Sequence, residues 1–172
     1  MRSAWKVRRR WPKRLGPEFA LPHALLFPSA VILDTNILLE LWINGEEPAD
    51  HVRPLHAALR DKTAQWLATP AMRIELERVL AYPHIAARLA GGAARFLGHF
   101  DALAQMVPAA ASAPFRCRDA DDQKFIDLAA AHPGAQLISH DREVLALRSQ
   151  MARLGVAVGE SFPARMPDVR AF

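Results

Sequence analysis

The chain has 172 residues, of which 51% are hydrophobic and 23% are charged. This length and balance are typical of one globular domain and exclude a disordered chain. A single cysteine, Cys117, excludes a disulfide within the chain and any zinc or iron–sulfur site built from several cysteines. We therefore expect a reducing, cytoplasmic location, and no segment approaches the roughly 20 apolar residues of a membrane span.

Positive charge is concentrated at the N-terminus. Seven of the first 14 residues are basic and none is acidic, so subtracting these seven from the net charge of +4 leaves about −3 for the rest. Trp5 and Trp11 lie among the cations, and such an arm could neutralise phosphates and stack on unpaired bases. The alternatives are a solvated, disordered leader or a misassigned start codon. We assign residues 1–28 to this arm.

Short apolar strands then alternate with helical patterns. Residues 30–33 form an apolar run typical of a strand buried on both faces of a parallel sheet. Helical spacing over 36–43 ends at Asn44-Gly45, and a second helical pattern covers 55–62. Residues 65–69 indicate another strand, after which Thr69 caps a helix that begins at Pro70.

The second half continues the alternation. Two helical patches around Gly91-Gly92, the second reaching Met106, predict a helical hairpin between strands. A helix with Phe125, Ile126 and Leu128 on its buried side begins near Asp119 or Asp121 and ends at Pro133-Gly134. Residues 136–139 predict a strand, Asp141 opens a helix that ends at Gly155, and 156–158 predict an edge strand. The alternation indicates a parallel α/β sheet.

Acidic residues follow two of these strands. Asp34 comes directly after the first strand and Asp141 follows the strand at 136–139. The carboxyl ends of parallel strands share the sheet edge where ligand sites are built. Further acids crowd the segment 119–122, and Glu75 lies on the helix after Pro70. Each acid alone has a plain alternative as a helix cap, a dipole partner or a surface residue.

Together, these acids indicate a metal site. Carboxylates in one cleft repel one another, which raises their pKa values unless a cation compensates. Hard oxygen ligands select Mg²⁺ or Mn²⁺, which coordinate phosphate. Such ions activate water and stabilise in-line displacement at phosphorus.

Four segments resemble the motifs of PIN-domain nucleases, in the family's order. Residues 31–38 (VILDTNIL) are similar to the opening strand and its Asp-Thr-Asn, and 75–80 (ELERVL) to the second-acid helix. Residues 118–125 (RDADDQKF), continuing to Leu128-Ala129, resemble the third-acid segment, and 137–145 (LISHDREVL) the fourth. The resemblance covers about residues 30–162, and the nearest subgroup is the toxin components of bacterial toxin–antitoxin systems.

The resemblance implies a three-layer α/β/α sandwich around a short parallel sheet over residues 29–162, with 163–172 as a C-terminal tail. It also implies a Mg²⁺- or Mn²⁺-dependent endoribonuclease with RNA as substrate and an antitoxin protein as partner. Glu75 is preferred to Glu77 because it keeps the family spacing to Leu80. The implied metal-binding and catalytic acids are Asp34, Glu75, Asp122 and Asp141, with Asn36, Ser139 and Asp119 in support.

The chain departs from the family pattern at Ser139-His140, where Thr-Gly is common. Ser139 keeps the hydroxyl, whereas His140 could narrow the cleft, contact phosphate or lie on its rim. His51 and His56 do not have the spacing of a helical metal pair, and Glu40 is expected on a solvated helix face.

Two other functions remain open at this point. One is a structure-specific DNA nuclease on the same core, although the 172 residues leave little length for a DNA-gripping element. The other is a catalytically silent nucleic-acid-binding or protein-interaction module that works through the basic arm. A homodimer also stays open.

Overall fold

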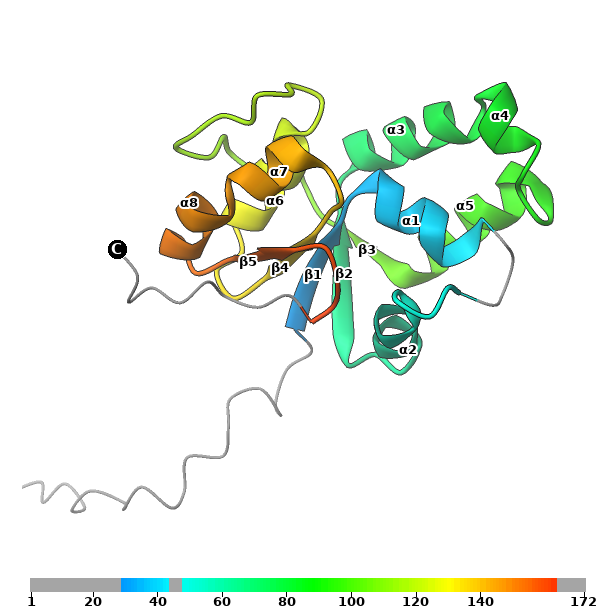
Figure 1. Cartoon of the computed structure of the whole chain (residues 1–172), viewed down its shortest axis with the longest axis horizontal. Coiled ribbons are helices and arrows are strands. Elements are labelled where there is room, and N and C mark those ends of the chain that lie inside the picture. The colour runs from blue at the N-terminus through cyan, green and yellow to red at the C-terminus, as the bar shows by residue number, and fades with distance from the viewer. Residues whose placement is uncertain (1–28, 44–47, 164–172) are drawn as a thin grey trace, which may run out of the picture.

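A five-stranded parallel sheet lies at the centre of the protein, in the order β3-β2-β1-β4-β5 (Figure 1). The computed structural model describes residues 29–43 and 48–163. The basic arm at 1–28, the predicted helix end at Asn44-Gly45 and the C-terminal tail from 164 onward lie outside the described residues. The strands are β1 (Ser29–Leu33), β2 (Ala64–Ala68), β3 (Ala104–Met106), β4 (Gln136–Ile138) and β5 (Ala157–Gly159).

The helices cover both faces of this sheet. The chain builds outward from β1 to β3 on one side and then returns to add β4 and β5 on the other. Right-handed crossovers therefore place the helices of the two halves on opposite faces, and Figure 1 shows α6, α7 and α8 apart from α1, α3 and α5. The predicted three-layer α/β/α sandwich is confirmed. The first set is α1 (Thr35–Trp42), α2 (Arg53–Arg60), α3 (Pro70–Leu80), α4 (Pro83–Ala86) and α5 (Gly92–Leu103), and the second is α6 (Gln123–Ala130), α7 (Arg142–Ala146) and α8 (Arg148–Arg153).

The core sits on both faces of the central strands. Val31, Ile32 and Leu33 are each at most 1% exposed, as expected for a strand covered by helices on both sides. On the α1–α5 face, the Trp66 ring of β2 meets the Phe100 ring of α5 edge-on, with ring centroids 4.7 Å apart. This aromatic contact fixes α5 against the sheet.

Three element boundaries differ from those predicted. Met106 lies in strand β3 rather than in a helix, because the chain turns extended at Ala104 and pairs with β2. The helical patch before Gly91-Gly92 is limited to the short helix α4, which begins at Pro83. The last predicted helix is divided at Leu147 into α7 and α8. Across the described residues, no helix has the length and apolar character needed to cross a membrane.

Replacing Phe100 by Ala should destabilise the protein by about 3–5 kcal/mol, because it leaves a cavity beside Trp66 in a fully buried site. Chemical denaturation monitored by circular dichroism measures the effect. Ile74→Ala is the matched control, since Ile74 is 65% exposed and its truncation should change the unfolding free energy by less than about 0.5 kcal/mol. Equal effects of the two substitutions would contradict this packing.

Candidate active site

The site begins where β1 and β4 end side by side. The two strands pair with Leu33 opposite Ile138, and the Asp34 backbone N–H donates to the Ile138 carbonyl at 3.0 Å. Asp34 and Ser139 are therefore neighbours although 105 residues separate them. This junction is also the point where the strand order reverses, which is the usual ligand position in open α/β sheets.

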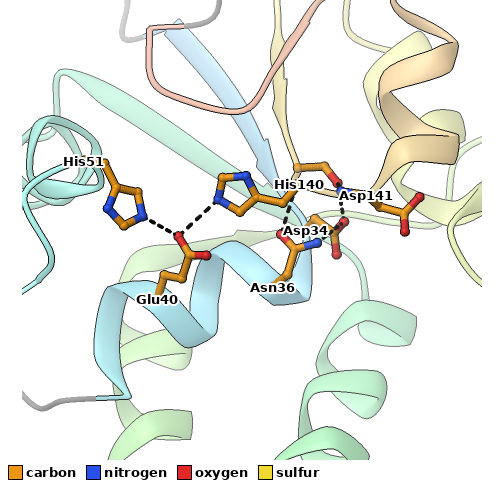
Figure 2. A network of polar contacts seen from close by, with 7 residues as sticks. Asp34, Asn36, Glu40, His51, His140 and Asp141 are labelled. Carbon is orange, nitrogen blue, oxygen red and sulfur yellow. Dashed lines mark hydrogen bonds and ion pairs between the residues drawn. The ribbon is translucent and has the colours of Figure 1, made fainter.

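Asp34 is held by two side-chain hydrogen bonds. Its Oδ2 accepts from Asn36 Nδ2 at 2.8 Å and from Ser139 Oγ at 2.5 Å (Figure 2). The side chain is buried. Burial raises the pKa of Asp34, the hydrogen bonds from Ser139 and Asn36 lower it, and the charge of Glu75 raises it again. The net effect is a pKa above the ordinary value of 3.8.

Ser139 connects Asp34 to Asp141. Besides donating to Asp34, its fully buried Oγ accepts from the Asp141 backbone N–H at 2.9 Å. Asp141 is the N-cap of α7, as predicted: its Oδ1 accepts from the backbone N–H groups of Glu143 at 2.7 Å and Val144 at 3.3 Å. Ser139 and the start of α7 together fix the relative positions of the two acids.

Asp122 brings a third carboxylate to the same edge. Neither Asp119 nor Asp121 is the N-cap of α6; Asp122 is, and its side chain makes no capping hydrogen bond. The prediction of the cap was wrong because Asp119 Oδ1 instead accepts from the Asp121 N–H, 2.8 Å away, and tightens the preceding turn. Desolvation first, then the charges of Asp34, Asp141 and Asp119, raise the pKa of Asp122 to about 7, against the attraction of Lys124.

Glu75 enters from α3 on the opposite face of the sheet. Its Oε1 accepts from Thr35 Oγ1 at 2.7 Å, and its Oε2 forms an ion pair with Lys124 of α6. Glu77, the competing acid, instead pairs with Arg73, which also binds Asp101. The structure therefore brings Glu75, and not Glu77, into the electrostatic neighbourhood of Asp34.

The sequence comparison identifies the family. A model of the PIN domain family matches residues 30–143, about two-thirds of the chain. The chain belongs to the PIN domain family. Comparisons with curated proteins and with solved structures found no significant match. PIN domains are generally nucleases, so membership indicates a hydrolase that acts on phosphodiester bonds.

The acidic residues of this PIN domain fit a hard divalent cation. Asp34, Asp122 and Asp141 are close enough for the charges of Asp34 and Asp141 to raise the pKa of Asp122. The positive charge of Lys124 lowers it. An oxygen donor set with excess negative charge is the kind of site that binds Mg²⁺ or Mn²⁺.

Several contributors to the site escaped the sequence analysis. Thr35 and Lys124 both contact Glu75. From the sequence alone, Thr35 is typical of a helix start and Lys124 of a basic surface residue. Glu40 was expected to face solvent, but its carboxylate contacts the rings of His51 and His140. Proximity in the sequence could have flagged Thr35 and Lys124, because each lies within two residues of a predicted acid, whereas Glu40 and His51 have no such neighbour.

In the metal-free protein, Asp122→Asn should raise the stability at pH 8 by about 1 kcal/mol, after allowance for solvent screening. A pKa of about 7 in the folded state, against 3.8, means that folding retains a proton between these values and that stability falls as pH rises through this window. At pH 3, below both pKa values, Asp122 is mostly protonated in the folded and the unfolded state, and the two proteins should be nearly equally stable. Thermal unfolding in EDTA at both pH values measures the effect.

The neighbouring exposed residue provides the control for this measurement. Asp121→Asn changes charge by the same amount one position away and should show little pH-dependent gain. A gain at pH 8 shared by both variants would point to net charge rather than to crowding at Asp122.

Proposed function

We propose that this PIN domain is a metal-dependent endoribonuclease that hydrolyses RNA phosphodiester bonds. The observation that carries the proposal is the crowding of Asp122 with Asp34 and Asp141 at one edge, where desolvation first, and then the charges of Asp34 and Asp141, raise the pKa of Asp122 to about 7. Such repulsion is costly unless a cation relieves it, and buried carboxylates with strongly raised pKa values concentrate at functional sites. Mg²⁺ or Mn²⁺, when bound, supplies charge neutralisation at the phosphate and activates water.

The residues around the acids position them rather than react. Asn36 and Ser139 hold the Asp34 carboxylate in one orientation. The α7 N-terminus orients Asp141. Thr35 and Lys124 hold Glu75, and Asp119, which raises the pKa of Asp122, is a supporting acid beside it. On this assignment the metal-binding acids are Asp34, Glu75, Asp122 and Asp141.

The choice of RNA and the biological role rest on the motif resemblance. We propose that the chain is a cytoplasmic toxin neutralised by a cognate antitoxin protein; a homodimer stays open. The basic arm at residues 1–28 would add sequence-independent affinity for the RNA backbone. A DNA nuclease on the same core is an outcome of the test below.

The test is cleavage of a mixed single-stranded RNA pool by the full chain in EDTA, Mg²⁺ or Mn²⁺. Cleavage should require metal, and Asp34→Asn or Glu75→Gln should reduce it at least about 100-fold, because each removes an ionised oxygen ligand. Glu77→Gln is the matched control on the same helix, and it should cleave like the wild type because Glu77 pairs with Arg73. Parallel reactions contain single-stranded DNA and flap DNA.

Each outcome separates one function from another. Metal-dependent cleavage of RNA that is lost in Asp34→Asn supports the proposal. Preferential cleavage of flap DNA would make the chain a structure-specific DNA nuclease. RNA binding without cleavage, lost on deletion of residues 1–28 and indifferent to metal, would make it a binding module.

Ser139→Ala should weaken the proposed Mg²⁺ binding about 10- to 100-fold, the usual range for residues that orient metal ligands. The substitution removes the hydroxyl that bridges the Asp34 carboxylate and the Asp141 backbone. Isothermal titration with Mg²⁺ measures the affinity. Unchanged affinity in a folded variant would exclude the orienting role.

A further inference from the structure

Three side chains outside the acid site converge from separate segments. Glu40 lies on α1, His51 lies in the turn before α2, and His140 lies in the connection between β4 and α7 (Figure 2). Glu40 Oε2 is 2.6 Å from His51 Nε2 and 3.1 Å from His140 Nε2. The three ligand atoms all lie within 4.8 Å of one another.

The backbone fixes two of these residues relative to the acid site. Asn36 and Glu40 are four residues apart on α1 and so lie on the same helix face. Asn36 Oδ1 accepts from the His140 backbone N–H at 3.3 Å, while Glu40 contacts the His140 ring. His140 is therefore held at two points by the same helix face, and its ring points away from Asp34 toward Glu40 (Figure 2).

We propose that Glu40, His51 and His140 form a second cation site, which binds a borderline transition-metal ion such as Zn²⁺. Two imidazole nitrogens and one carboxylate are a donor set that Zn²⁺ accepts. Imidazole selects Zn²⁺ and its neighbours in the transition series, whereas all-oxygen sites select Mg²⁺ or Mn²⁺. The two adjacent sites therefore differ in the metal that each prefers, and the second does not rest on the nuclease proposal.

The separations between these atoms are compatible with coordination. Ligand bonds of about 2.0–2.2 Å in a tetrahedron place ligand atoms roughly 3.3 Å apart. The contacts of Glu40 with the two rings lie close to that spacing, at 2.6 and 3.1 Å. The His51 side chain is 54% exposed and that of Glu40 35% exposed, so both can adjust by small rotations.

Three protein ligands leave one position of a tetrahedral ion open. Structural zinc sites are usually closed by four protein ligands, whereas three ligands with a solvent position are typical of exchangeable or catalytic ions. The ion in this site should therefore exchange with solvent and be removable by a chelator without unfolding. Bound there, it would tie the turn at residues 49–52 to the connection that carries Asp141.

The test is Zn²⁺ binding to the full chain in competition with a chromophoric chelator, in excess Mg²⁺ to occupy the acid site. Wild-type protein should bind one Zn²⁺, and His51→Ala or Glu40→Gln should weaken binding at least about 10-fold. His84→Ala is the matched control, because His84 is exposed and belongs to α4, away from the cluster. Circular dichroism checks that each variant is folded. The His51 variant should fold, because the His51 side chain is largely exposed.

A second measurement separates this site from the acids. Asp34→Asn should keep its Zn²⁺ affinity, and Co²⁺ should give a visible absorption band that Asp34→Asn retains and His51→Ala loses. Equal Zn²⁺ binding by wild type and His51→Ala, or no binding by the wild type, would overturn the proposal and leave the cluster as a hydrogen-bonded contact of two imidazoles with Glu40. Loss of binding in Asp34→Asn alone would also overturn it, because the ion would then belong to the acid site.

Discussion

The pairing of β1 with β4 is the constraint on which the site depends. Its register sets Leu33 opposite Ile138, so Asp34 and Ser139 leave the sheet at the same level. The strand order also reverses here, because β2 is added beside β1 and β5 is added beside β4, on opposite sides of this pair. A slip in this register would separate Asp34 from the Ser139 hydroxyl and Asp141 from both. The apolar residues 31–33 and 137–138, almost completely buried, make such a slip unfavourable.

The acids lower the stability of the fold that positions them. Apolar burial and sheet pairing bring Asp34 and Asp122 into a partly dry edge, where burial disfavours the charged form of each. Hydrogen bonds from Ser139 and Asn36 offset part of that cost at Asp34, and the α7 N-terminus donates to the third acid, Asp141. The uneven support explains why Asp122, whose carboxylate caps no helix N–H, has the most strongly raised pKa of the acids at this edge. Charge crowding at Asp122 therefore lowers the stability of the folded protein.

The sequence was informative wherever the signal was local. Strands β1, β2, β4 and β5 coincide with apolar runs, and the Asp141 cap with a strand-to-helix boundary. Strand β3 was missed because Ala104–Met106 has no apolar run; its extended form comes from pairing with β2. The roles of the four acids and of their supporting residues remain predictions. The geometry favours Glu75 over Glu77 and Asp122 over Asp121, because Glu77 pairs with Arg73 and Asp121 is exposed to solvent. His51 lies 11 residues and His140 lies 100 residues after Glu40, so no spacing rule relates the three.

The ion pair between Lys124 and Glu75 has a consequence for the order in which ligands arrive. With Asp34, Glu75, Asp122 and Asp141 all ionised, the four negative charges and one lysine leave a local charge of −3. A phosphodiester, itself an anion, is repelled by such a surface. One divalent ion reduces the imbalance to −1 and a second reverses it to +1. On the proposed function, a nucleic acid strand should therefore enter after the cation, and the protein without its ion should be a poor RNA binder at this edge.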